Sequence, residues 1–74
     1  MKQIDVREIA DKQAAIFKTF NSLDLGETME LINDHDPTPL KQKFSNDYPK
    51  EFTWGYIEEG PDVWRIAITK TAGS

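Results

Sequence analysis

The sequence predicts an α+β two-layer sandwich with the element order β-α-β-α-β-β, in which two helices cover one face of a four-stranded mixed sheet. Three observations indicate this class. Four short segments have the composition or the polar and apolar alternation of strands, and two longer segments repeat apolar residues at helical spacing. Residues typical of turns separate these segments. The 74 residues leave room for one domain, predicted over residues 1–70, with a tail over residues 71–74.

The first half of the chain predicts a strand, a helix and a second strand. Residues 3–6 alternate polar and apolar side chains, as in a strand with one buried face. A helix is expected over residues 12–25, with Asp11 as its N-cap. Its apolar stripe consists of Ile16, Phe17, Phe20 and Leu23. Residues 28–32 predict the second strand, and the turn-forming residues 33–37 end it.

A second helix is indicated by a narrow stripe with one apolar residue at every fourth position: Leu40, Phe44 and Tyr48. Two starts fit the sequence. Thr38 can be the N-cap with Pro39 in the first helical position, or Asp36 can precede Pro37 in the same way. Pro49 is expected to end the helix, because proline disfavours a helical backbone in the residue before it.

A β-hairpin follows the second helix. Residues 52–58 and 63–69 are rich in aromatic and β-branched side chains, and the turn residues 59–62 join them. Side chains alternate across a strand, so one face of the last strand carries Trp64, Ile66 and Ile68. We expect this face to lie under the helices. The aromatic residues Trp54, Tyr56 and Trp64 are expected to be mainly core, whereas any of them on the uncovered face of the sheet would form a patch for a partner.

Chain connectivity restricts the topology. Right-handed crossovers place both helices on the same face of the sheet and leave the other face open to solvent. Each connection between the first three strands contains a helix, so these strands are expected to be parallel. The hairpin makes the fourth strand antiparallel to the third.

Composition excludes several classes of function. The chain has no cysteine, which removes disulfides, thiolate nucleophiles, persulfide carriage and thiolate metal sites. The net charge is −4, and the lysines of residues 41–50 are interleaved with acidic and amide side chains, so nucleic acid is not an expected partner. There is no apolar run of about 20 residues and no signal-peptide pattern, which predicts a cytoplasmic protein without a membrane partner.

Two strings of residues are distinctive, Asn-Asp-His-Asp-Pro at 33–37 and Glu-Gly-Pro-Asp-Val-Trp at 59–64. Together with residues 4–9 and 25–28, they resemble the bacterial domain-of-unknown-function family 2249 over nearly the whole chain. That family is similar in fold to the TusA/SirA sulfur carriers. This resemblance implies the strand order 1-2-4-3, with the fourth strand between the second and the third.

This chain lacks the reactive residue of the sulfur carriers. In those carriers a Cys-Pro pair opens the first helix, whereas this chain has Asp11-Lys12 at that place, so sulfur transfer is not implied. Members of the resembled family occur beside or fused to hemerythrin-like di-iron domains and other redox proteins. The resemblance therefore implies a redox, metal or sulfur-handling setting.

The candidate site lies where the carboxyl ends of the first three strands meet, because ligands of open α/β sheets bind at that edge. Seven residues near these strand ends are predicted to bind a ligand or a partner: Arg7, Asp34, His35, Asp36, Glu59, Trp64 and Arg65.

Several interpretations of this edge remain open. His35, Asp34 and Asp36 could hold a divalent transition metal, or the two aspartates could cap backbone amides in an ordinary polar loop. An anion or another small molecule could also bind at the start of the second helix, helped by Arg7, Arg65 and a protonated His35. The competing explanation for the two arginines is that they form ordinary salt bridges with Asp36 or Glu59.

The function predicted is a non-catalytic interaction module. The edge carries site-like residues, but the sequence has no nucleophile motif, no Gly-rich phosphate loop and no second histidine. The partner implied by the resemblance is a hemerythrin-like or other redox protein. The alternative is a metal-binding protein that uses His35 and nearby carboxylates; no other cofactor is expected.

Overall fold

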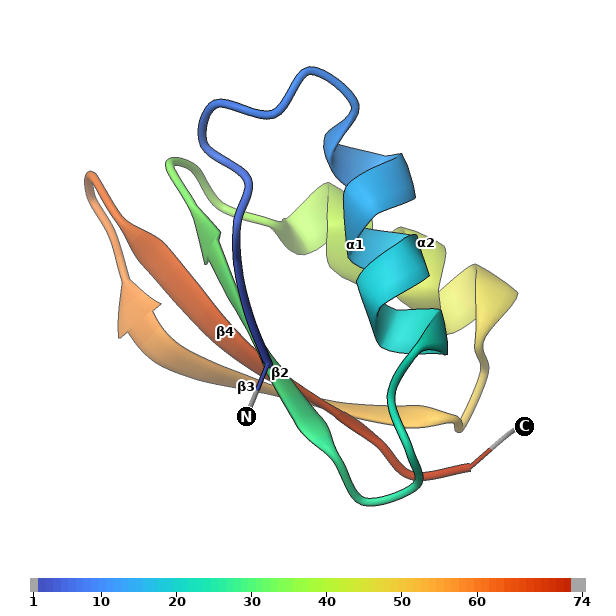
Figure 1. Cartoon of the computed structure of the whole chain (residues 1–74). Helices are drawn as coiled ribbons and strands as arrows, with labels where there is room; N and C mark the ends of the chain where they lie inside the picture. Colours follow the sequence, from blue (N-terminus) through green and yellow to red (C-terminus); the bar gives the residue numbers. More distant parts are fainter. Residues whose placement is uncertain (1, 73–74) are drawn as a thin grey trace.

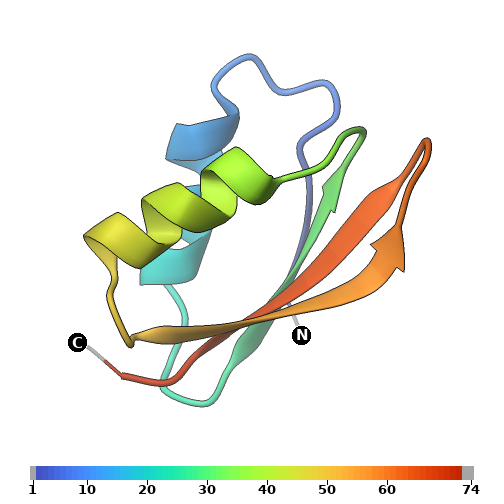
Figure 2. The same cartoon turned by 180° about the vertical axis from the view of Figure 1, so that it is seen from behind.

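The structure, a computed structural model, describes residues 2–72. Its elements follow the predicted order: β1 (Lys2–Asp5), α1 (Lys12–Asn21), β2 (Thr28–Asn33), α2 (Thr38–Asp47), β3 (Phe52–Glu59) and β4 (Trp64–Lys70). The sheet order is β1-β2-β4-β3, with β1 parallel to β2 and β4 antiparallel to both of its neighbours. Both helices lie on one face of the twisted sheet (Figures 1 and 2). The predicted fold class and strand order are confirmed.

The core lies between the sheet and the helices. The two central strands, β2 and β4, contribute Met29, Leu31, Ile66 and Ile68, all fully buried. The remaining buried apolar side chains come from both helices and the segments beside them: Val6, Ile16, Phe20, Leu23, Leu40 and Phe44. The face of β4 predicted to lie under the helices is therefore the buried face.

The aromatic side chains form one continuous network of ring contacts across this core. Phe44 is its centre, with ring centroids 4.7–5.8 Å from five other rings: Phe17, Phe20, Tyr48, Phe52 and Trp54. The network continues along β3 from Trp54 to Tyr56 at 6.4 Å and from there to Trp64 on β4 at 6.2 Å. One side chain of α2 thus connects α1, α2 and the edge strand β3.

The start of α1 is capped as predicted. The Ala14 amide donates to Asp11 Oδ1 at 3.2 Å. The helix ends at Asn21, earlier than expected, because Ser22 stops it: the Ser22 hydroxyl donates to the carbonyl of Thr19 at 2.6 Å. Leu23 still reaches the core, from the turn that follows.

Asp11→Ala is expected to lower the stability of the domain by about 1 kcal/mol, because an amide of the first turn loses its acceptor. For a domain of this size, the loss corresponds to a decrease in Tm of about 5 °C. Thermal melts followed by circular dichroism measure it. Asp11→Asn is the matched control, since asparagine caps equally well; an equal decrease in both variants would contradict the capping role.

The start of α2 differs by one residue from both predicted alternatives. Pro37 is the N-cap and Thr38 is the first helical residue. The Asp36 carboxylate accepts from the Thr38 amide at 3.0 Å and from the Thr38 hydroxyl at 2.6 Å. The helix ends at Asp47, just before Pro49, as predicted.

The hairpin has the predicted limits to within one residue, with an irregularity in its register between Tyr56 and Glu58. Gly60, in the connecting turn, has a φ of +50°, and a Cβ there would lie 2.8 Å from the indole ring of Trp64. Glycine at this position thus permits both the turn and the close approach of Trp64. At the other end, Thr71 of the predicted tail donates its amide to the Glu51 carbonyl at 2.9 Å; residues 73–74 lie outside the described range.

Candidate functional site

The predicted site edge exists as a structural feature. The carboxyl ends of β1, β2 and β3 and the start of β4 lie at the same end of the sheet (Figure 1). The pairing register joins them, since Asp5 is opposite Ile32, and Trp64 is opposite both Asn33 and Glu59. All seven predicted site residues are thus on or next to this edge.

The two arginines at this edge do not have the predicted partners. Arg7 binds Asp5, with Nη2 at 2.6 Å from Oδ2 and Nε at 3.0 Å from Oδ1. The hydrogen bond from the Arg7 side chain holds the pKa of Asp5 below its ordinary value. Arg65 binds Glu30 at 2.7 Å and lies 3.9 Å from Glu58. The prediction of salt bridges with Asp36 or Glu59 is therefore wrong.

The histidine contacts one of its two neighbouring aspartates. His35 Nδ1 lies 2.7 Å from Asp34 Oδ1, and this hydrogen bond lowers the pKa of Asp34. Lys12 Nζ lies 3.7 Å from the same oxygen. Asp36 instead accepts both hydrogen bonds from Thr38, which agrees with the capping interpretation of that residue.

A metal site is not assembled at this edge. Within residues 2–72, no group of three or more His, Asp or Glu side chains is arranged to hold a metal ion. His35 and Asp34 would supply two adjoining ligands, fewer than the three or four protein ligands usual for zinc. Metal binding through these residues stays a prediction that requires ligands from a partner.

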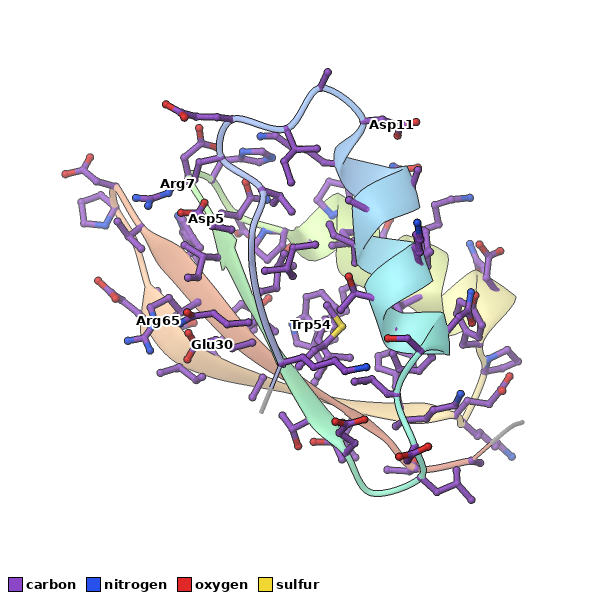
Figure 3. All side chains as sticks on the ribbon, in the orientation of Figure 1. Asp5, Arg7, Asp11, Glu30, Trp54 and Arg65 are labelled. Carbon is purple, nitrogen blue, oxygen red and sulfur yellow. The ribbon has the colours of Figure 1, made fainter. Side chains whose placement is uncertain are left out.

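Sequence reasoning missed Glu30. It lies in the middle of β2, and its side chain is only 7% exposed although it belongs to the sheet face opposite the helices (Figure 3). Gln3 Nε2 donates to one carboxylate oxygen and Arg65 Nη2 to the other. These two hydrogen bonds, that of Gln3 first, hold the pKa of Glu30 below its ordinary value. A charged residue inside a central strand, between apolar neighbours, was the signal that could have identified it.

The comparison with protein-family models gives one result. Residues 3–70 match the model described as an uncharacterized conserved protein, DUF2249. The chain belongs to the DUF2249 family. Comparisons of this DUF2249 chain with curated proteins and with solved structures gave no match. Among the residues described, no helix has the length and apolar character needed to cross a membrane.

The second half of β3 in this DUF2249 domain carries exposed apolar side chains. Tyr56 is 38% and Ile57 is 47% exposed, and Trp64, in contact with Tyr56, is partly buried. Figures 1 and 2 both show the hairpin extending past the helices at this end. We call Tyr56, Ile57 and Trp64 the hairpin patch. The prediction that Tyr56 is mainly core is wrong, because its side chain is 38% exposed on β3, an edge strand of the sheet.

Trp54 has an unusual polar atom. Its indole Nε1 is buried and has no hydrogen-bond partner within residues 2–72. The ring is held between Phe44 and Tyr56, at centroid distances of 5.8 Å and 6.4 Å. Packing in the aromatic network therefore fixes this side chain without satisfying its donor.

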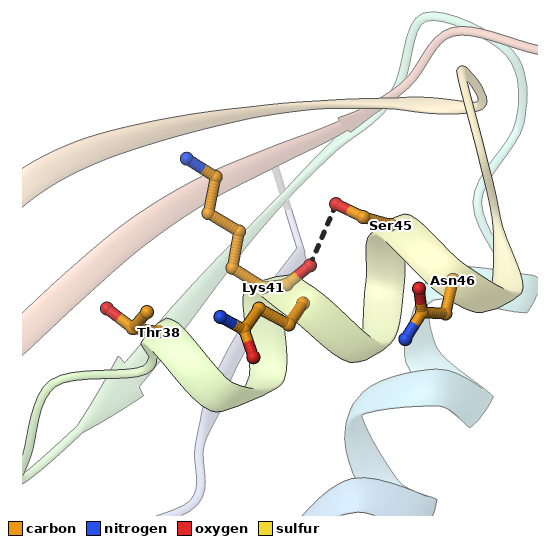
Figure 4. Close-up of a pocket in the computed structure, with 5 residues that line it drawn as sticks. Thr38, Lys41, Ser45 and Asn46 are labelled. Atoms are coloured by element: carbon orange, nitrogen blue, oxygen red, sulfur yellow. Dashed lines mark hydrogen bonds between the residues drawn. The ribbon is translucent and has the colours of Figure 1, made fainter.

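Two depressions of similar volume lie on this DUF2249 domain. One, of about 500 Å³, is lined by Asp5, Arg7 and Glu8 at the predicted edge. The other, of about 510 Å³, lies along the outer face of α2 and is lined by polar side chains: Thr38, Lys41, Gln42, Ser45 and Asn46 (Figure 4). All five come from one helix, and the Ser45 hydroxyl donates to the Lys41 carbonyl of that helix at 3.1 Å. A groove on one exposed helix face supplies no converging groups for catalysis.

Proposed function

We propose that this DUF2249 domain is a non-catalytic interaction module that docks on a protein partner through the hairpin patch. The observation that carries the proposal is the exposure of Tyr56 and Ile57, two large apolar side chains in the second half of β3. Aromatic side chains are enriched in the buried centres of protein interfaces. Tyr56 and Ile57 also lie on β3, an edge strand of the sheet.

The chemistry of the predicted edge supports a non-catalytic role. Arg7 and Asp5 neutralise each other, and so do Arg65 and Glu30. His35 is held by Asp34, and the chain has no cysteine to act as a nucleophile. These charged groups are therefore engaged with one another, which suits a binding surface better than proton or group transfer.

Charge indicates the complementary surface of the partner. The hairpin patch adjoins the exposed carboxylates of Glu58, Glu59 and Asp62, and the chain carries a net charge of −4. Complementary charges steer association and select among partners. The expected partner surface is thus apolar at its centre and basic at its border.

The partner class follows from the resemblance alone. A hemerythrin-like or other redox protein is proposed because members of the resembled family occur beside such domains. The likeness to TusA/SirA sulfur carriers belongs to the same proposal, and a domain without their cysteine would have kept a binding role in that setting and not the transfer step. Binding of a divalent metal by His35 and Asp34, completed by ligands of the partner, is the alternative, supported by their 2.7 Å contact.

Capture of a partner from native cytosol tests the proposal. The bait proteins are the wild type, the double variant Tyr56→Ser/Ile57→Ser, and Leu25→Ser as a matched control. Leu25 is 64% exposed but lies in the turn between α1 and β2, at the opposite end of the sheet. The expected result is one redox protein, identified by mass spectrometry, that the wild type and the control retain and the double variant loses.

The size of the loss can be estimated. Truncation of two central interface side chains typically costs about 1–2 kcal/mol each, so the affinity of the purified partner should fall by about a hundredfold. Equal capture by all three baits, or equal loss in Leu25→Ser, would contradict docking through the hairpin patch.

A further inference from the structure

The free edge of β3 presents backbone groups that point away from the sheet. β3 lies at one end of the strand order, so only the side next to β4 is paired (Figure 1). The Thr71 amide donates to the Glu51 carbonyl at 2.9 Å, and the backbone groups of an antiparallel strand point alternately to its two sides. Phe52, Trp54 and Tyr56 therefore direct their N–H and C=O groups away from β4.

These outward groups have no other backbone partner. Outside the ladder with β4, none of the backbone hydrogen bonds within residues 2–72 involves Phe52, Trp54 or Tyr56. A row of free N–H and C=O groups is a template for pairing with another chain. Each of the three residues offers one donor and one acceptor to an added strand.

The two edges of the sheet differ in the features that prevent such pairing. Short strands, charged side chains and prolines are the usual protections of an edge strand. The described part of β1, the other edge, has four residues, with Lys2 and Asp5 at its ends. β3 has eight residues, and its segment 52–57 contains neither a charged residue nor a proline. This segment is therefore the better site for strand addition, and the irregularity in register after Tyr56 marks its end.

The flank of α2 leaves room above this edge. Phe44 of α2 contacts Phe52 and Trp54 of β3, with ring centroids 5.3 Å and 5.8 Å apart. Lys43 lies over an aromatic ring of α1 at 5.9 Å, so that flank of α2 faces α1. Lys41, about 200° around the helix from Lys43, lies on the other flank, which lines the depression of about 510 Å³ (Figure 4). The side chains of an added strand have room in this depression.

The carboxyl end of the β3 edge is acidic. Glu58 and Glu59 belong to β3 itself, Asp62 follows in the turn, and all three are exposed. Arg65 lies 3.9 Å from Glu58 but is only 2.7 Å from Glu30, so it neutralises Glu30 first. Complementary charge on a paired segment would be a lysine or an arginine at this end.

A second copy of this chain fits the edge less well. Antiparallel pairing of two β3 strands about a two-fold axis places both helix layers on the same face of the joined sheet. The polar flanks of the two α2 helices, each with an exposed Lys41, would then face each other. Each chain also carries a net charge of −4. An extended segment of another protein brings neither a second helix layer nor this charge.

We infer that the partner presents an extended segment that pairs with β3 at residues 52–56 as a fifth strand, with a lysine or an arginine beside Glu58 and Glu59. The inference rests on the proposed function and specifies which element of the partner docks. Main-chain hydrogen bonds supply affinity in this mode of recognition, and side chains supply specificity. Apolar side chains of the segment contact Tyr56 and Ile57, which joins strand pairing to the hairpin patch.

Amide hydrogen exchange measured by NMR tests this inference with a probe peptide, acetyl-Val-Thr-Val-Thr-Val-Lys-Lys-amide. In the free chain, the outward amides of Phe52, Trp54 and Tyr56 should exchange quickly, and the amides of Thr53 and Gly55, which point to β4, should exchange slowly. Peptide at about ten times its Kd should slow the three outward amides about tenfold and leave the two inward amides unchanged.

Two further peptides separate backbone pairing from charge. Replacing each threonine with proline should abolish binding, because proline disfavours strand pairing. Replacing both lysines with glutamates should weaken binding.

The matched variants of the chain test the same charge. Glu58→Gln/Glu59→Gln should bind the lysine peptide about fivefold more weakly, the loss of two exposed ion pairs. Glu8→Gln/Asp24→Asn removes two exposed carboxylates outside β3 and β4, and its affinity should equal that of the wild type.

Four results would overturn strand addition: no binding of the lysine peptide at about 1 mM, equal binding of the proline peptide, equal protection of outward and inward amides, or equal weakening in the two double variants. Protection that rises with the concentration of the chain alone would assign the edge to a second copy and would also overturn it. Partner capture that depends on Tyr56 and Ile57, without the alternating protection, would leave docking through the hairpin patch intact and reject only the added strand.

Discussion

Phe44→Ala is expected to remove a large part of the free energy of unfolding of the domain. Phe44 is fully buried, and its ring contacts five others that belong to both helices and β3. Truncation of a buried phenylalanine costs about 3–5 kcal/mol, because apolar contacts are lost and a cavity remains. A domain of this length has a total stability of about 4–10 kcal/mol, so the loss consumes much or all of it.

Urea unfolding followed by circular dichroism and tryptophan fluorescence measures this effect. Leu25→Ala is the control: Leu25 is 64% exposed, and its truncation should change the stability by no more than about 0.5 kcal/mol. A cooperative, fully folded Phe44→Ala protein with near wild-type stability would show that the aromatic network is not the centre of the core.

Glu30→Ala is expected to lower the free energy of unfolding by about 2 kcal/mol, a typical value for hydrogen bonds to a charged group. The substitution leaves Gln3 and Arg65 without the carboxylate that joins β1, β2 and β4 across the open face. Glu58→Ala is the control, because that carboxylate is 48% exposed and 3.9 Å from Arg65. Its effect should stay within about 0.5 kcal/mol. Equal losses in the two variants would remove the distinction between the buried and the exposed partner of Arg65.

Unfolding by acid measures the contribution of the Glu30 charge to stability separately from the contribution of its side-chain size. The pKa of Glu30 is lower in the folded chain than its ordinary value of 4.5, so the folded state favours the ionised carboxylate. The resulting stability is fully present above about pH 4.5 and is lost as the pH falls through the lower folded pKa. Glu30→Gln should therefore show a smaller decrease in the free energy of unfolding below pH 4.5 than the wild type. Part of the decrease should remain, because the pKa values of Asp5 and Asp34 are also lowered. An unchanged pH dependence in Glu30→Gln would contradict this role.

The fold could be predicted from local patterns because they agree with one another. The stripe with Ile16 and Phe20 is buried as a helix face, and the alternation that places Ile66 and Ile68 on one side of β4 is the observed burial. The position of β4 between β2 and β3 could not be predicted from these local patterns. Local pattern and chain direction indicate only that β4 pairs with β3, and the strand order came from the family resemblance.

The places of the candidate residues in the fold could be predicted, but their contacts could not. Strand ends and loops follow from the sequence, so Arg7, His35 and Trp64 lie at the end of the sheet where they were expected. The partner of a long side chain depends on register: Arg65 meets Glu30 because β4 lies beside β2, a pairing across 35 residues. The contacts of Arg7 and Asp36 are made with residues nearby in the sequence. Arg7 binds Asp5, two residues away, and Asp36 accepts from the Thr38 amide.

The exposure of Tyr56 was the main feature that side-chain type did not predict. Tyr56 has the spacing of a core residue on β3, but β3 is an edge strand and its Tyr56 side chain is 38% exposed. The length of α2, which ends at Asp47 before Pro49, was predictable, but its position over the sheet was not.

Hydrogen exchange of the complex with the captured partner tests the interaction proposal most directly. Amides of β3 and β4 near Tyr56, Ile57 and Trp64 should gain protection on binding, whereas those at the outer face of α2 and in the turn at Leu25 should exchange as in the free chain. Protection confined to α2 or to the Leu25 turn, with unchanged exchange at the hairpin tip, would contradict docking through the hairpin patch.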